Sequence, residues 1–291
     1  MYGELMTKVW HHSNEKKRLI FSIFTKITDT TKKRTDNQKQ FEIYYKDLLR
    51  GLADYAKTCN ADYILLSPEV TDYDNLNVYK IQQWEKLLNE YDNVMYLDFD
   101  IIPNTTRNIF EEFDFNKVVT RLLPVNDYLK QTGFKAPGES FTDFYERTKL
   151  KEYQEQKKEL DQYHWLIKGQ QKKDMFKADS AIGCKDVIAN TGTFGGNRNA
   201  RDTLKFSERL DHCKKLIDSI KHLDDRYFYN NEIIVSFMLD RYNIPTIDLP
   251  PHWHELVLKD TPMIKLRYSY LIHVITKDFK GVYKVLNRDF S

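Results

Sequence analysis

Two carboxylates, Asp98 and Asp100, lie two positions apart and follow a short apolar run at residues 94–97. The run predicts a buried strand, and open α/β sheets bind their ligands beyond the carboxyl ends of such strands. Oxygen ligands suit Mg²⁺ or Mn²⁺, and such an ion can neutralise a diphosphate while a bond to it breaks. The pattern favours a metal site, with a solvated acid pair at a strand end as the alternative.

A histidine, His273, lies in a second apolar run at residues 271–275. Neutral imidazole is a common ligand of divalent ions, so His273 could complete the shell begun by the two acids. Lys277 and Lys280 follow, and an ammonium group there would stabilise a departing nucleotide diphosphate. The alternative is a buried histidine whose hydrogen bonds are satisfied within the protein.

Residues 189–197 combine Asn190, Thr191 and Gly192 with further glycines. Glycine permits close approach of a ligand to the backbone, and Asn and Thr can hydrogen-bond to hydroxyl groups. The segment is therefore a candidate ligand-binding strand end, with an ordinary glycine turn beside a strand as the alternative.

Two further groups of residues have weaker claims. Thr25 and Lys26 follow the first predicted strand, where they could contact a nucleotide, although a solvated lysine is the plainer interpretation. His252, Trp253 and His254 follow two prolines, and no Cys or acid stands at metal-site spacing from them. We expect an aromatic loop that stacks on an acceptor sugar.

The elements that must hold these side chains follow from hydrophobic periodicity. Strands are predicted at residues 19–24, 61–66 and 94–97, and helices at 37–58 and 78–91. Strands that alternate with helices build a parallel sheet through right-handed crossovers. Further along the chain, the pattern predicts strands at 117–123, 246–249 and 271–275 and helices at 143–164, 204–223 and 231–242.

Composition restricts the class of protein. Lys and Arg total 45 against 43 for Asp and Glu, so the charge gives no reason to expect nucleic acid or a membrane as partner. The three cysteines are odd in number and far apart, which argues against a disulfide framework and favours a reducing compartment. No stretch resembles a signal peptide or a transmembrane span, so we expect a soluble cytoplasmic protein.

Taken together, these motifs resemble those of the GT-A glycosyltransferases, closest to the retaining family-eight type and small viral enzymes of similar build. The resemblance covers about residues 19–123 and 188–281. It implies a Rossmann-like α/β fold, with a mixed and mostly parallel sheet flanked by helices. It also implies one catalytic domain over residues 1–291, with a nucleotide-binding half at 19–123, a largely helical insertion at 126–186 and an acceptor-side half at 188–291.

The resemblance assigns roles to individual residues. Asp98 would contact the ribose or the metal, and Asp100 and His273 would ligate the metal. Lys277 or Lys280, with Gly281, would bind the phosphates, although this chain has Thr276 where the family shows a Gly and Gly281 where it shows a Pro. The remaining donor contacts would come from Lys80, on the helix that carries the core residue Trp84, and from Asn190, Thr191 and Gly192.

The same resemblance places Asn231 and Glu232 near the reacting sugar carbon. Glu232 could take the acceptor proton in an inverting reaction, whereas Asn231 could steady an oxocarbenium-like state in a retaining one. The alternative is a helix N-terminus whose acidic residues complement the helix dipole. Both functions stay open from the sequence, and the family resemblance favours retention.

The implied activity is transfer of a sugar from a nucleotide-sugar donor, a UDP-sugar, to a glycan or protein acceptor with Mn²⁺ or Mg²⁺ as cofactor. Two alternatives remain. A haloacid dehalogenase-like phosphatase or phosphotransferase also uses two acids after an apolar strand, but near the start of its domain. An inactive sugar-binding protein of the same fold is the other alternative, since fold does not fix function.

Overall fold

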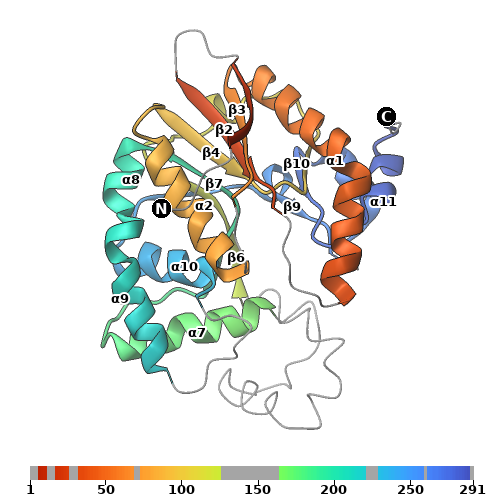
Figure 1. Ribbon diagram of the computed structural model, residues 1–291. Helices are drawn as coiled ribbons and strands as arrows, with labels where there is room; N and C mark the ends of the chain where they lie inside the picture. Colours follow the sequence, from red (N-terminus) through yellow and green to blue (C-terminus); the bar gives the residue numbers. More distant parts are fainter. Residues whose placement is uncertain are drawn as a thin grey trace, which may run out of the picture. The chain divides into compact units, whose positions relative to one another are not determined.

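The computed structural model describes residues 6–11, 17–25, 32–68, 73–125, 164–220, 229–258 and 261–288 (Figure 1). The chain divides into two compact units. The first consists of Met1–Arg121, Thr191–Thr203 and Thr246–Ser291, and the second of Leu122–Asn190 and Leu204–Pro245. In the described part of the chain, no helix is both long and apolar enough to cross a membrane.

The chain forms a seven-stranded mixed sheet whose residues belong mostly to the first unit, with the end of β6 and the start of β7 in the second. Strand β2 (Arg18–Ile23) lies between and parallel to β3 (Asp62–Leu66) and β4 (Asn93–Leu97). The order across the sheet is β1-β3-β2-β4-β7-β6-β8, where the other strands are β1 (Met6–Trp10), β6 (Val118–Pro124), β7 (Val187–Asn197) and β8 (Thr246–Asp248). Strands β1 and β4 pair antiparallel with β3 and β7, respectively, and β6 pairs parallel with β8.

Helices flank this sheet, which confirms the mixed α/β fold expected from the sequence. Helix α1 (Lys32–Thr58) presents Leu48, Leu52 and Ala56 to Ile20, Met95 and other apolar side chains of the strands, in one buried cluster. Helix α2 (Tyr73–Leu87) packs Trp84 edge-on against Phe194 of β7. Because both faces are covered, the central strands are continuous apolar runs rather than alternating ones (Figure 1).

A second, three-stranded sheet positions the C-terminal motif. Its order is β5-β10-β9, with β5 at Ile101–Pro103, β10 at Leu271–His273 and β9 at Glu255–Leu256. Strand β10 pairs antiparallel with β5 and parallel with β9, so His273 lies opposite both Ile101 and Leu256. Strand β5 begins directly after Asp100, and this pairing brings the two sequence motifs together.

Shorter elements complete the first unit. They are helices α3 (Ile109–Glu112), α8 (Arg198–Leu204) and α11 (Phe279–Val285) and the 3₁₀ turns η3 (Pro251–Trp253) and η4 (Met263–Tyr268). Strand β1 was not expected, because the first 18 residues carry no apolar run. It pairs antiparallel with β3, and Trp10 packs on Tyr63 with 5.3 Å between ring centroids.

The second unit contains three helices: α7 (His164–Ala178), α9 (Phe206–Ser219) and α10 (Asn231–Arg241), each in contact with the other two. A buried ion pair links α7 to α10, since Lys172 Nζ lies 2.7 Å from Asp240 Oδ2. Most of the predicted insertion, including the helix expected at 143–164, lies outside the described residues, which resume at His164 with α7.

Candidate metal centre

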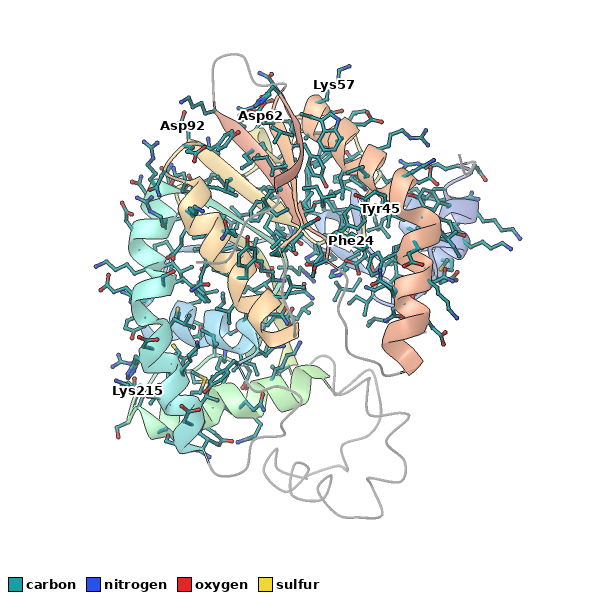
Figure 2. All side chains as sticks on the ribbon, viewed as in Figure 1. Phe24, Tyr45, Lys57, Asp62, Asp92 and Lys215 are labelled. Carbon is teal, nitrogen blue, oxygen red and sulfur yellow. The ribbon has the colours of Figure 1, made fainter. Side chains whose placement is uncertain are left out.

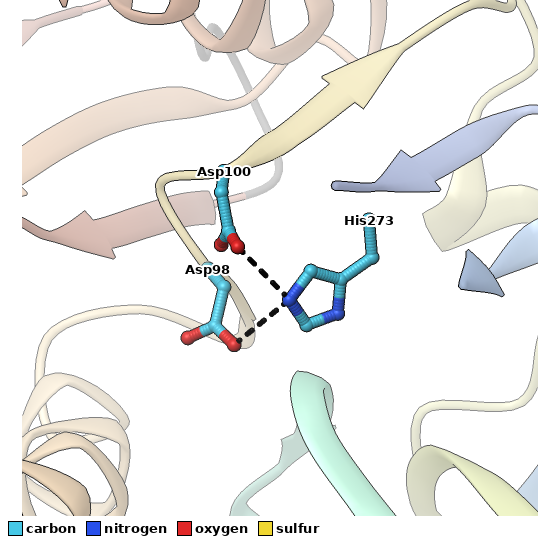
Figure 3. Close-up of side chains that lie close together, drawn as sticks. All are labelled: Asp98, Asp100 and His273. Carbon is cyan, nitrogen blue, oxygen red and sulfur yellow. Dashed lines mark ion pairs between the residues drawn. The ribbon is translucent and has the colours of Figure 1, made fainter. Parts of the chain in front are cut away.

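Three side chains from two distant parts of the sequence converge in the first unit. The Nε2 atom of His273 lies 3.3 Å from Oδ2 of Asp100 and 3.6 Å from Oδ2 of Asp98 (Figure 3). One possible ligand atom from each residue falls within a group that spans no more than 4.8 Å. Asp98 and Asp100 come from the β4–β5 turn and His273 from the end of β10, as the sequence predicted for these three.

The β4–β5 turn is held in place on both sides. Its backbone is fixed by hydrogen bonds from Asp98 N–H to the Gly192 carbonyl (2.8 Å) and from Val274 N–H to the Asp100 carbonyl (3.0 Å). Phe99, between the two acids, packs in an aromatic cluster with Phe24 and Tyr45, at 4.9 and 5.4 Å between ring centroids; Figure 2 labels Phe24 and Tyr45. Phe99 is 4% exposed, so the turn that carries the two acids is also fixed to the core by this side chain.

Each oxygen of Asp98 has its own neighbours. The Tyr96 hydroxyl donates to Oδ1 at 2.6 Å, and Lys80 Nζ lies 3.5 Å from the same atom and 4.9 Å from the centre of the Tyr96 ring. The second oxygen, Oδ2, faces His273. Lys80 is buried beside Asp98, so it orients this carboxylate; the sequence predicted a nucleotide contact for it.

Asp100 is the buried acid of the pair, with 5% of its surface exposed. The ammonium group of Lys277 donates to its Oδ2. Burial acts to raise the pKa of this carboxyl, but the charges of Lys277 and His273 outweigh it and hold the pKa of Asp100 well below its usual range. Lys277 is thereby distinguished from Lys280, which is exposed on α11.

Behind His273 lies a second histidine. His254 Nε2 is 3.0 Å from His273 Nδ1, the two nearly parallel rings have their centroids 5.2 Å apart, and the far nitrogen of His254 contacts the Thr193 hydroxyl. Burial lowers the pKa of His254 well below its ordinary value, and the neighbouring charge of His273 acts in the same direction. His254 is therefore a neutral group inside the protein.

This placement differs from the sequence-based expectation that residues 252–254 form an aromatic loop that stacks on an acceptor sugar. Trp253 is 2% exposed and packs edge-on against Phe113 and Tyr270, and His254 is 1% exposed. Only His252 is exposed, with its ring against Tyr270. Burial of the apolar Trp253 side chain places this turn in the core. The spacing of residues within the turn does not predict that burial.

The site requires a glycine at position 192, because a side chain there would clash with its neighbours. A Cβ atom at this position would stand 2.5 Å from Cε1 of His273 and 2.7 Å from Oδ2 of Asp98, both below any ordinary contact. The segment that contains Gly192 is strand β7 and not a turn. Thr191 is fully buried in the same strand, and Asn190 is 2% exposed where β7 enters the second unit.

The two residues predicted to be catalytic belong to the second unit. Asn231 and Glu232 form the first turn of α10, where the Asn230 side chain caps the helix by accepting the Glu232 N–H at 2.9 Å. The Glu232 carboxylate pairs with Lys168 of α7. Within this unit the arrangement is that of a capped helix start with a neutralised acid.

The remaining predicted contacts have local partners. Thr25 donates its hydroxyl to the Pro68 carbonyl at 2.7 Å, and Lys26 lies outside the described residues. Gly281 belongs to the first turn of α11, where its N–H is donated to Asp278 Oδ1 at 2.9 Å. A Cβ there would meet the same carboxylate at 2.3 Å, so the helix cap accounts for this glycine.

The donor set fits a divalent cation. Two carboxylate oxygens and one imidazole nitrogen suit Mn²⁺ or Mg²⁺, and the two acids supply negative charge to balance the ion. Sequence reasoning missed Tyr96, Thr193 and His254 around these ligands. Tyr96 could have been found, because residues two apart on a strand share a face. His254 reaches His273 only through the β9–β10 pairing, for which the sequence carries no signal.

Comparison with known proteins gave matches among solved structures alone; no protein-family model and no curated protein matches the chain. One similar structure is a glycosyltransferase involved in the glycosylation of the major capsid of PBCV-1, at 13% identity and a TM-score of 0.42, covering 93% of this chain and 99% of that one. Another is mouse xyloside xylosyltransferase 1, at 10% identity and 0.41, covering 90% and 98%.

A third is the bifunctional glycosyltransferase WbbM, at 9% identity and a TM-score of 0.45. It covers 96% of this chain, which spans about half the length of WbbM, with 52% of that chain covered. Because these identities and scores are low, we base the functional proposal on the residues of the site.

Proposed function

We propose that the chain is a metal-dependent glycosyltransferase that moves a sugar from a UDP-sugar to a glycan or protein acceptor, with retention of configuration. The convergence of Asp98, Asp100 and His273 is the observation that supports this most directly. Two of these three side chains, Asp100 and His273, are buried. Burial of charged groups costs desolvation energy, and such clusters are typical of sites that bind a charged ligand.

The proposed chemistry divides between the ion and the protein. An ion bound by the three residues would neutralise the diphosphate as it departs from the sugar. Lys277, which contacts Asp100, would provide a second positive charge for the phosphates. Tyr96 and Lys80 hold Asp98 in orientation, and Gly192 leaves room beside the ligands.

Roles on the transferred sugar are proposed for Asn231 and Asn190 of the second unit and for Thr191 of the first. Asn231 would steady the developing positive charge on the sugar, and Asn190 and Thr191 would hydrogen-bond to its hydroxyl groups. Glu232 is paired with Lys168, and a carboxylate neutralised in this way is a poor base for an acceptor hydroxyl. This pairing favours the retaining reaction over the inverting one.

A donor screen tests the proposal. Thermal unfolding and sugar release would be followed with UDP-, GDP- and TDP-sugars, with and without Mn²⁺. A true donor stabilises the folded protein by mass action, so one UDP-sugar should raise the unfolding temperature only when Mn²⁺ is present. No response to any nucleotide sugar would exclude the proposal.

A matched pair of variants ties the result to the site. Asp100→Asn removes one charge from the ligand set and should abolish both the Mn²⁺-dependent shift and turnover. Asp211→Asn makes the same chemical change on the exposed face of α9 and should alter neither. Release of phosphate from p-nitrophenyl phosphate, lost in Asp98→Asn, would instead support the phosphatase alternative, whose nucleophile would be the first acid.

A further inference from the structure

We propose that His254 is a positioning residue, which with Thr193 fixes the proton arrangement of His273 so that Nε2 is free to bind the ion. The proposal rests on the metal-dependent function above. The three side chains form one buried chain of contacts from Thr193 Oγ1 through both nitrogens of His254 to His273 Nδ1. All of it lies in the first unit.

The positions of the protons along this series of hydrogen bonds follow from the need for His273 Nε2 to bind the metal. A neutral histidine that gives Nε2 to a metal must carry its proton on Nδ1. His273 Nδ1–H then donates to His254 Nε2, which accepts through its lone pair. His254 must in turn carry its own proton on Nδ1 and donate it to the Thr193 hydroxyl oxygen. Every nitrogen in the chain has a defined role once the ion is bound.

Without an ion, every hydrogen bond in the series can also form with donors and acceptors exchanged. His273 Nε2–H can point at Asp100 Oδ2, 3.3 Å away, while His273 Nδ1 accepts from His254 Nε2–H and His254 Nδ1 accepts from the Thr193 hydroxyl. The hydroxyl group serves both states because it can donate or accept. In both arrangements each imidazole carries one proton, so the two hold equal numbers of protons.

Burial makes His254 effective in this role. His254 is 1% exposed and His273 is 6% exposed, so water does not compete for the bond between them. The two rings lie 12° from parallel with 5.2 Å between their centroids, so the 3.0 Å contact between the nitrogens lies close to the plane of both rings, as an imidazole hydrogen bond requires. Hydrogen-bond partners behind a metal-binding histidine set both its orientation and its basicity, and their loss typically weakens binding roughly 10- to 100-fold.

Variants at His254 separate hydrogen bonding from packing. His254→Phe keeps a buried ring but offers no acceptor, and His254→Gln keeps an acceptor oxygen. Binding of Mn²⁺ alone, measured from the electron paramagnetic resonance signal of the free ion without any nucleotide sugar, should weaken roughly 10- to 100-fold in His254→Phe and recover to within a few-fold in His254→Gln. Equal weakening in both, at matched unfolding temperatures, would overturn the hydrogen-bonding role.

A second variant covers the event that His254→Phe fails to fold. Thr193→Val removes the hydroxyl group at similar volume and should weaken Mn²⁺ binding by a smaller factor than His254→Phe. Where His254→Phe does not fold, unchanged Mn²⁺ affinity in Thr193→Val would sink the proposal. If the unaltered protein binds no Mn²⁺, or Asp100→Asn binds it as well, the proposed function fails instead.

Discussion

At the scale of single residues, the centre is defined by what surrounds its ligands. Asp98 and Asp100 differ only in position along one turn, yet one has a tyrosine and a lysine on its outer oxygen and the other is buried against Lys277. His273 has a histidine behind it. Each ligand is oriented by a different partner, so the effects of single substitutions should differ in kind.

Gly192→Ala tests whether space at the site is a requirement. The new methyl group would stand 2.5 Å from the His273 ring, and β7 cannot yield because its backbone holds Asp98. We expect Mn²⁺ affinity, measured by isothermal titration, to fall roughly 10-fold or more, at least as far as on loss of a hydrogen-bond partner behind a metal-binding histidine.

Gly51→Ala is the matched control for this substitution. Its methyl group would meet only Pro103 Cδ at 3.9 Å, an ordinary contact, within helix α1. Mn²⁺ affinity should stay unchanged there, and the helix should gain up to about 1 kcal/mol of stability. Equal losses in both variants would contradict the steric explanation.

Lys277→Gln should have opposite effects on ion binding and on turnover. The ammonium group neutralises Asp100 and so competes with an incoming cation. Its removal should tighten Mn²⁺ binding to the nucleotide-free protein, while turnover with the donor falls because a phosphate contact is lost. Lys280→Gln, an exposed lysine three residues on, should change neither by more than a few-fold. Weaker Mn²⁺ binding in Lys277→Gln would contradict this interpretation.

At the scale of elements, the sequence predicts individual strands and helices but does not predict how distant strands pair. Apolar runs predicted β2, β3 and β4, and helical spacing predicted α1 and α2, because buried faces impose their period on the chain. The same patterns could not predict that β7 runs antiparallel to β4, nor that His273 belongs to a separate small sheet. Pairing between distant strands depends on packing that no single segment encodes.

The link between α7 and α10 provides an element-scale prediction. Lys172 is 1% exposed and bonds to Asp240 and to the carbonyls of Lys185 and Val187. Lys172→Met leaves the Asp240 carboxylate buried without its counter-charge, which should lower the free energy of unfolding by about 3–5 kcal/mol in urea denaturation. The double variant Lys172→Met with Asp240→Leu should recover part of this loss. No recovery would mean that the two carbonyl contacts, and not the ion pair, dominate.

At the scale of the whole molecule, the division into two units separates the proposed tasks. All three candidate ligands belong to the first unit, and Asn231 and Glu232 belong to the second. The sequence predicted a single domain with an insertion. In the structure, one boundary between the two units falls within strand β7, between Asn190 and Thr191. A ligand bound to the ion should therefore stabilise the first unit directly.

The cysteines offer a probe for each unit. Cys59 lies in the first and Cys213 in the second, and both are fully buried, which raises the pKa of their thiols to about 11 and about 12. Cys184 is partly exposed. Because the thiolate is the reactive form, native protein at pH 8 should react with a thiol reagent at Cys184 first and should react at all three cysteines only in urea.

Mn²⁺ should alter the order in which the buried thiols become reactive in partial denaturant. Binding to the folded first unit lowers the population of its opened form by mass action, so labelling of Cys59 should slow as Mn²⁺ is added. Cys213 should slow less, because its unit contributes none of the three candidate ligands. Mass spectrometry of quenched samples measures both rates at once, with Asp100→Asn as the control that should show no Mn²⁺ effect. Equal slowing of the two thiols would show that the chain opens as one cooperative body and would contradict this prediction.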